Sequence, residues 1–336
     1  MPRKITPFIK FVYFVFLYLY SALSQAESTV LLVSSNSHFG IVHRIEAALF
    51  SQPSPRPNIQ HMLVESLPAD RLPDELPAPP LIVTIGAEAL EAVLKTHTSQ
   101  PILSILIRKH TYQNLLNIYH RKQNSQTCPI TAIYLDQPLK RQINLIKKVV
   151  PEINHSNATI GVLFGPASIN SQEELMTIAL EEKIKLNTIY VNNFENPVAV
   201  MDAFLAEVKV LLALPDSRIY NPRTARGILL AAFHKHVPLI GYSQSYVKNG
   251  ALVSVFSNTK QIAQQAAQSI ITILDKESLP EPQYPQEFSI EINYQVAKSL
   301  NIDIESESTL KQDLVQMELL PKTNILAKQN TSTSSK

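Results

Sequence analysis

The sequence is poor in the residues that cross-link or bend a chain. Its 336 residues include one cysteine, Cys128, and only seven glycines. No internal disulfide is possible, and turns must rely mainly on the 23 prolines and on Asn, Asp and Ser. The sequence contains no P-loop, C-x-x-C, H-E-x-x-H or G-x-S-x-G motif. These absences exclude a disulfide scaffold and remove the usual sequence support for nucleotide, redox, zinc-protease and serine-hydrolase sites.

The net positive charge of the chain comes from its N-terminal segment. Residues 1–26 hold three of the 30 Lys and Arg residues and none of the 28 acidic residues, so the rest of the chain carries a formal charge of −1. Without a basic excess, neither nucleic acid nor an anionic membrane is an expected partner.

Residues 11–23 form a short apolar run, and Ser24 and Ala26 supply small residues for a cleavage site. We therefore expect a signal peptide cleaved after Ala26, a periplasmic mature chain and no stable membrane insertion; an uncleaved anchor or a buried helix is the alternative.

The stretch 210–256 combines apolar runs, polar turns and a helical segment. Its runs at 210–214, 238–241 and 251–256 lack polar alternation, which is typical of parallel strands buried on both faces. A weaker copy of this plan occupies residues 81–107. One plan used twice predicts an α/β protein of two Rossmann-like lobes, with parallel sheets flanked by helices and a hinged cleft between the lobes.

The order of these elements predicts the domain boundaries. We expect lobe 1 to comprise residues 27–132 and 253–286, lobe 2 to comprise 133–252 and 287–304, and residues 305–336 to form a flexible tail. The hinge candidates are the segments 133–137, 251–256 and 286–288. In lobe 2, Ser171 followed by Glu174 predicts a capping box at a helix start.

Polar residues at predicted strand ends are the candidate ligand contacts, because ligands of open α/β sheets bind there. Asp216 suits either an acceptor for an amine or a turn residue, and Arg108 either a carboxylate clamp or a solvated turn. The full set is Ser34, Ser35, Asn36, His38, Phe39, Gly86, Ala87, Arg108, Phe164, Pro166, Asp216, Ser217, Tyr242, Ser243 and Gln244. His234 and His236 stand two apart and do not share a helix face, so we expect no metal and no cofactor.

Three segments carry a family resemblance. They are 231–255 (AAFHKHVPLIGYSQSYVKNGALVSV), 142–166 and 292–300 (INYQVAKSL). Together they resemble the TrpX-like family of ABC-transporter periplasmic substrate-binding proteins, over about residues 28–304. The resemblance implies the type I periplasmic binding fold and an ABC permease in the inner membrane as partner.

The chain departs from the family pattern at strand ends, where ligand specificity resides. Ile107-Arg108-Lys109 replaces the family's Thr-Asp-Pro, and Pro215-Asp216-Ser217 replaces Pro-Thr-Asp. His38-Phe39 lies where the family has His-Pro. The fold therefore transfers more safely than an aromatic amino-acid ligand.

These observations lead to one functional expectation and two alternatives. We expect a monomeric, non-enzymatic solute-binding component of an ABC uptake system, with a small polar ligand that is amino-acid-like or related. The first alternative is a periplasmic sensor or accessory module of the same fold, serving a signalling or outer-membrane uptake partner. The second is an exported hydrolase, which requires Ser243 within hydrogen-bond reach of a histidine such as His38.

Overall fold

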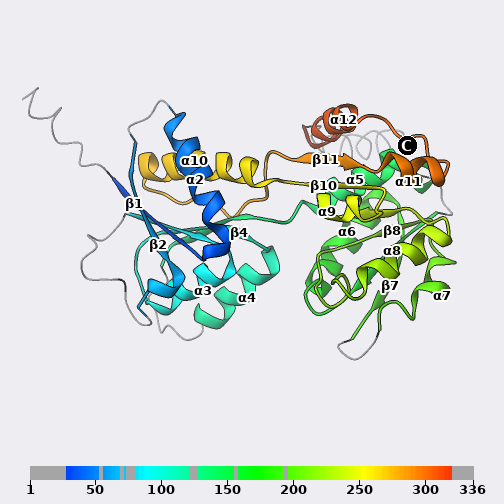
Figure 1. Ribbon diagram of the computed structural model, residues 1–336, viewed down its shortest axis with the longest axis horizontal. Coiled ribbons are helices and arrows are strands. Elements are labelled where there is room, and N and C mark those ends of the chain that lie inside the picture. The colour runs from blue at the N-terminus through cyan, green and yellow to red at the C-terminus, as the bar shows by residue number, and fades with distance from the viewer. Residues whose placement is uncertain are drawn as a thin grey trace, which may run out of the picture.

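The protein consists of two α/β lobes, seen side by side in Figure 1. The computed structural model describes residues 28–52, 56–68, 72, 80–120, 128–154, 158–192 and 196–319. The expected signal segment, residues 1–26, lies outside the described residues. Two separate sheets, each flanked by helices, confirm the predicted fold class.

The sheet of lobe 1 has five parallel strands in the order β2-β1-β3-β4-β5. The strands are β1 (Thr29–Ser34), β2 (Asn58–Leu63), β3 (Leu81–Ile85), β4 (Ile102–Ile107) and β5 (Ile130–Tyr134). Helices α2 (Phe39–Phe50) and α10 (Thr259–Lys276) pack on one face, and α3 (Ala87–Lys95) and α4 (Lys109–His120) on the other. Short 3₁₀ turns occupy Asn36–His38 and Val64–Ser66. Burial on both faces explains the apolar runs of this sheet.

The sheet of lobe 2 has six strands in the order β11-β10-β9-β8-β6-β7, and only the β10–β11 pair is antiparallel. The strands are β6 (Thr159–Phe164), β7 (Lys185–Tyr190), β8 (Val210–Leu212), β9 (Leu239–Gly241), β10 (Val253–Phe256) and β11 (Ser289–Ile292). One face carries α5 (Leu139–Val149), α6 (Gln172–Glu182), α11 (Tyr294–Ser299) and α12 (Glu307–Leu319). The other carries α7 (Met201–Leu205), α8 (Ala225–His234) and α9 (Gln244–Lys248). The 3₁₀ turns Pro151–Asn154 and Ile169–Ser171 complete the lobe.

The expected lobe boundaries need two corrections. Residues 253–256 were predicted to belong to lobe 1, but they form β10, which pairs with β9 and β11 in the second sheet. Strand β5 remains in the first sheet as far as Tyr134, two residues beyond the expected boundary. The chain therefore crosses between the lobes three times, directly after β5, directly after β10, and in the segment between α10 and β11.

The expected flexible tail begins with an ordered helix. Residues 307–319 form α12, which packs beside α5 and β11 in Figure 1. Leu310 is 1% exposed and Leu314 is fully buried, and both belong to the apolar core of lobe 2. Their spacing of four residues places them on one helix face, and burial of that face holds the helix in place. The prediction of a flexible tail is wrong for this part, and residues 320–336 lie outside the described residues.

Candidate ligand-binding cleft

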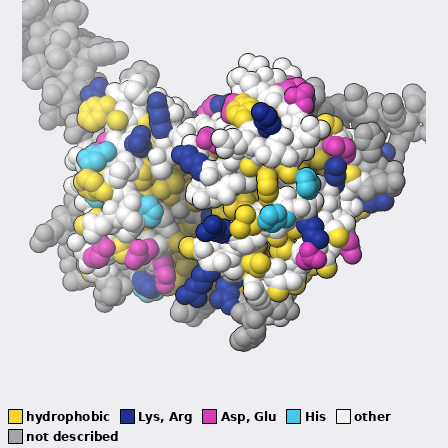
Figure 2. All heavy atoms as spheres, turned by 45° about the vertical axis from the view of Figure 1, so that its right-hand side comes forward, with side chains coloured by type: hydrophobic (Ala, Val, Ile, Leu, Met, Phe, Trp, Pro, Cys, Tyr) yellow, Lys and Arg dark blue, Asp and Glu magenta, His cyan; other side chains and the backbone are white. Residues whose placement is uncertain are grey.

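A cavity of about 340 Å³ lies between the two lobes. Its walls come from the start of α4 in lobe 1, from α6 and the strand ends of lobe 2, and from all three crossing segments. Figure 2 shows the surface hollowed between the two bodies. A cavity bounded by both lobes and by their connections changes shape whenever the lobes move.

A β-bulge at the end of β4 precedes the basic wall of the cavity. The register with β5 shifts between Ile105 and Ile107, and Leu106 adopts a φ of 52°, in the left-handed region. Leu106 consequently packs toward the α2 and α10 face, as Ile105 does, and Ile107 toward the α3 and α4 face. Bulges of this kind redirect the residues that follow, here Arg108. A left-handed leucine costs about 1–2 kcal/mol, so the surrounding packing must enforce this conformation.

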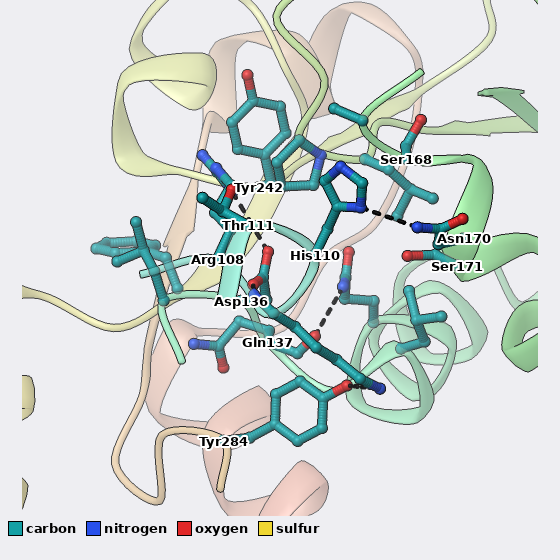
Figure 3. A pocket seen from close by; sticks show the side chains of 18 of the residues that line it. Arg108, His110, Thr111, Asp136, Gln137, Ser168, Asn170, Ser171, Tyr242 and Tyr284 are labelled. Carbon is teal, nitrogen blue, oxygen red and sulfur yellow. Dashed lines mark hydrogen bonds and ion pairs between the residues drawn. The ribbon is translucent and has the colours of Figure 1, made fainter. Parts of the chain in front are cut away.

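Arg108 reaches from lobe 1 toward an aromatic side chain of lobe 2. Its Cζ lies 5.7 Å from the ring centroid of Tyr242, and its Nη1 donates to Oδ1 of Asp136 at 3.4 Å. Figure 3 shows Arg108 between these two residues. The other carboxylate oxygen of Asp136 accepts from the backbone N–H of Lys109 at 2.6 Å, at the start of α4. With one long ion-pair contact and a side chain 38% exposed, Arg108 retains N–H groups for a ligand.

Lys109 joins the two lobes at the cavity wall. Its Nζ donates to Oε2 of Glu174 in α6 at 2.9 Å and to the hydroxyl of Tyr284 at 3.0 Å. Burial opposes the charged form, but the bonds to Tyr284 and Glu174 outweigh it and raise the pKa of Lys109 above its ordinary value. Lys109 therefore stays protonated at neutral pH. The predicted capping box is wrong, because Ser171 makes no side-chain cap and Glu174 turns toward Lys109.

His110 makes a second polar contact between the lobes. Its Nδ1 lies 2.9 Å from the side-chain nitrogen of Asn170 in lobe 2, and its Nε2 lies 3.0 Å from that of Asn114 in its own helix. Figure 3 shows His110 directed at Asn170 across the cavity. Residues 108–110, at the β4–α4 junction, thus form a continuous edge of lobe 1 that faces lobe 2.

Three predicted site residues line this cavity: Arg108, Tyr242 and Ser243. Tyr242 belongs to an aromatic cluster, with ring centroids 4.6 Å from Tyr246 and 6.2 Å from Tyr220. Ser243 directly precedes α9 and makes no side-chain cap. These residues come from different lobes, as the cleft hypothesis requires.

Asp216 occupies a structural position. Its carboxylate is 2% exposed and accepts four hydrogen bonds, from the backbone N–H groups of Ala167, Ser168 and Arg218 and from the Ser168 hydroxyl, at 2.9–3.0 Å. A Cβ on Gly165 would lie 2.7 Å from Oδ2 of Asp216, so the loop after β6 depends on a glycine there. Of the two interpretations of Asp216, these bonds favour the turn residue.

The other predicted residues of lobe 1 cluster at the ends of β1 and β3, outside the lining of this cavity. Ser34 Oγ lies 2.9 Å from Nε2 of His61, and Ser35 Oγ lies 3.0 Å from Nδ1 of His38. The backbone of Gly86 has a φ of 90°, and a Cβ there would approach the His38 ring to 2.8 Å. The His38 ring thus contacts Ser35 and lies against Gly86. The cluster also holds Asn36, Ala87 and Phe39, and Phe39 is 49% exposed.

The remaining predicted residues in lobe 2 lie outside the cavity lining. Phe164 is 1% exposed and belongs to the core, and Pro166 is half-buried in the loop after β6. Ser217 is exposed, and Gln244 donates to Glu291 at 3.1 Å on the surface. Strand-end position therefore predicted three residues of the cavity lining, whereas these four residues of lobe 2 lie outside it.

The sequence prediction missed most of the polar lining. The polar lining residues absent from the candidate set include Lys109, His110, Asp136, Gln137, Gln142, Asn170, Glu174 and Tyr284. Several lie on the crossing segments or at helix starts, and their only sequence signal was a position beside a predicted strand end or hinge. Gln142 is notable because it is 5% exposed and its Oε1 has no hydrogen-bond partner. The lining thus offers cationic donors, carboxylates, amides and aromatic rings, which suits a small polar molecule with groups of more than one kind.

Other kinds of site find no support in the described residues. No group of three or more His, Cys, Asp or Glu side chains there is arranged to hold a metal ion. No helix in the part of the chain that the structure describes is long and apolar enough to cross a membrane.

Comparisons with known proteins agree with this architecture. A family model described as ABC transporter substrate binding protein matches residues 76–314. Among solved structures, a conserved domain protein from Vibrio cholerae has 20% identity and a TM-score of 0.56, covering 85% of this chain and 98% of its own. An ABC domain from Streptococcus pneumonia in complex with L-Trp has 18% identity and a TM-score of 0.56, with the same coverage.

A ligand-free, open substrate-binding protein with adhesive properties from Clostridium difficile has 13% identity and a TM-score of 0.60, covering 83% of this chain and 96% of its own. At these identities, the structural matches establish the two-lobed fold alone. Among curated proteins, none matches the sequence.

Proposed function

The chain belongs to the family of ABC transporter substrate-binding proteins, and on that premise we propose that it captures a small polar organic molecule in the cavity between its lobes. The observation that carries the proposal is the composition of the cavity wall, to which both lobes and all three crossing segments contribute. A ligand held there contacts both lobes at once and stabilises the arrangement in which they are closest.

The proposed ligand is amino-acid-like or related, with an anionic group and at least one hydrogen-bond donor. Arg108 supplies a guanidinium with N–H groups to spare for a carboxylate or a similar anion. Asp136, 22% exposed, and the unpartnered Oε1 of Gln142 supply acceptors for an amine or hydroxyl. Tyr242 and Ser243 add a ring face and a hydroxyl from lobe 2. The L-Trp of the Streptococcus structure fits this general class, but Arg108 and Lys109 replace the family's Asp-Pro, so the ligand need not be aromatic.

The proposed setting is the periplasm. Residues 1–26 have the pattern of a cleaved signal peptide, and the mature chain would deliver its ligand, as a monomer, to an ABC permease in the inner membrane. The family itself supports an uptake system as the destination. Phe39, exposed at the end of lobe 1 that carries the other predicted residues, is proposed to approach the ligand only when the lobes close.

A thermal-shift screen of the chain from Glu27 onward tests the proposal. The panel holds amino acids, nucleosides, sugars and small anions. A ligand at a hundred times its dissociation constant adds about 2.7 kcal/mol to the free energy of unfolding. We expect stabilisation by one class of compound that carries both an anionic group and a donor. No stabilisation by any class at millimolar concentration contradicts the proposal.

A further inference from the structure

Arg141 on α5 is a buried cation at the centre of the hinge. Its side chain is 4% exposed and forms a bidentate ion pair with Glu318 of α12, with Nε to Oε1 at 2.5 Å and Nη2 to Oε2 at 2.8 Å. Its Nη1 donates to Oε1 of Gln137 at 2.7 Å and to the carbonyl oxygen of Pro285 at 3.1 Å. Gln137 lies on the first crossing segment and Pro285 on the third. One guanidinium therefore joins α12 to two of the three connections between the lobes.

The same network reaches the remaining connection. Nε2 of Gln137 donates to Oγ of Ser257, just after β10, at 2.9 Å. The Ser257 hydroxyl donates to the carbonyl oxygen of Glu287 at 2.6 Å. All three crossing segments are thus linked by side-chain hydrogen bonds that begin at Glu318. Gln137 and Ser257 also line the cavity, so the network extends from its wall to α12.

Helix α12 also contacts the third crossing segment through a second ion pair. Lys311 Nζ lies 3.1 Å from Oε2 of Glu287. Phe288 is 1% exposed, and its ring centroid lies 4.2 Å from Cζ of Arg141 and 5.5 Å from Nζ of Lys311. The end of the third segment is therefore held between α5 and α12.

We propose that α12 is a hinge clamp, which sets the range of lobe positions by holding Arg141 against the crossing segments through Glu318. Crossing segments absorb the backbone rotation when two lobes open or close. A guanidinium that is 4% exposed needs its carboxylate partner, because an unpaired charge is not stable in such surroundings. Without that carboxylate, Arg141 turns toward solvent and releases Gln137 and Pro285 together. The proposal rests on the proposed function only in one respect, namely that the lobe motion serves ligand binding.

The test compares two substitutions in α12 of the ligand-free chain from Glu27 onward. Glu318→Gln removes the carboxylate of the clamp. Asp313→Asn is the matched control, because it removes a carboxylate of α12 that pairs with Lys148 of the same α5 and not with Arg141. One readout is hydrogen exchange at the backbone amides of Tyr134 and Gln283. The Tyr134 amide donates to the carbonyl oxygen of Gln283 and the Gln283 amide to that of Ala132, so these bonds join the third crossing segment to the end of β5, where the first crossing segment begins. The other is the distance distribution between spin labels at Glu88 and Leu180, exposed positions on the two lobes.

The clamp predicts a local effect of Glu318→Gln. We expect exchange at Tyr134 and Gln283 to become about tenfold faster and the distance distribution to broaden, while amides of β1 and β8 keep their rates. Asp313→Asn leaves both readouts at wild-type values. Equal behaviour of the two variants, or uniform acceleration across the strands with Glu318→Gln, overturns the proposal.

A milder variant decides the outcome if Glu318→Gln does not fold. Arg141→Lys keeps the positive charge. It loses the bidentate contact with Glu318 and the hydrogen bond to the carbonyl oxygen of Pro285. We expect the same local acceleration, smaller in size, and an unchanged rate overturns the proposal. Since every sample is free of ligand, a failed ligand screen and a failed clamp experiment are separate results.

Discussion

The ammonium of Lys109 in lobe 1 lies 2.9 Å from a carboxylate oxygen of Glu174 in lobe 2. Together with the His110–Asn170 contact, this ion pair joins the two lobes at the wall of the cavity. Both side chains are about a third exposed, at 34% and 39%, so water weakens the attraction. The pair therefore acts as a weak latch that a ligand or a change of salt can shift.

The first prediction concerns this latch. Glu174→Gln removes its charge, and we expect the mean distance between the lobes to increase while the free energy of unfolding falls by less than about 1 kcal/mol. Raising the salt concentration should shift the wild type in the same direction, because screening weakens exposed pairs. Small-angle scattering measures the change. Glu173→Gln, at the exposed neighbouring position, is the control, and an equal response of both variants contradicts the latch.

The second prediction separates stability from binding at Asp216. Asp216→Ala leaves the backbone N–H groups of Ala167 and Ser168 without their acceptor, so we expect a loss of about 2–4 kcal/mol in the free energy of unfolding. Denaturant unfolding measures it. Ser217→Ala, on the exposed neighbour, should change stability by less than about 0.5 kcal/mol. A stable Asp216→Ala variant with lost ligand affinity would restore Asp216 as a binding residue.

The third prediction concerns the single thiol. Cys128 is 7% exposed, and burial raises the pKa of its thiol, so little thiolate forms at neutral pH. We expect a thiol reagent to label the folded protein at least about a hundredfold more slowly than the denatured chain. Fast labelling of the native protein would mean that the edge of the first sheet opens readily.

Much of the fold follows from the sequence because it depends on local patterns. The run Leu81–Ile85 is buried at every position and apolar except for Thr84, as expected for a parallel strand buried on both faces. The assignment failed at β10 because Val253 and Val255 fit either sheet, and only pairing with β9 and β11 decides between them. It failed again at α12, where Leu310, Leu314 and Met317 follow helical spacing within a mostly polar stretch.

The site was less predictable because its geometry depends on how the lobes meet. Arg108 and Tyr242 were found as strand-end residues, but nothing local places one against the other. The spacing of Ser171 and Glu174 fitted a capping box equally well, and only the position of Lys109 in the other lobe explains the actual partner. Asp216 was predicted as a ligand contact because it follows a strand, but its carboxylate accepts hydrogen bonds from the neighbouring loop.

The most direct test of the central claim is the thermal midpoint of the wild type and of Arg108→Ala, measured across the compound panel. The cleft hypothesis predicts that one compound class raises the wild-type midpoint, and that Arg108→Ala folds normally but binds about 10–100-fold more weakly, the value of a charge-assisted hydrogen bond. Asp216→Ala, corrected for its lower starting midpoint, should respond as the wild type does. Stabilisation of the wild type and of Arg108→Ala to the same extent would contradict a ligand in this cavity, as would no stabilisation of either.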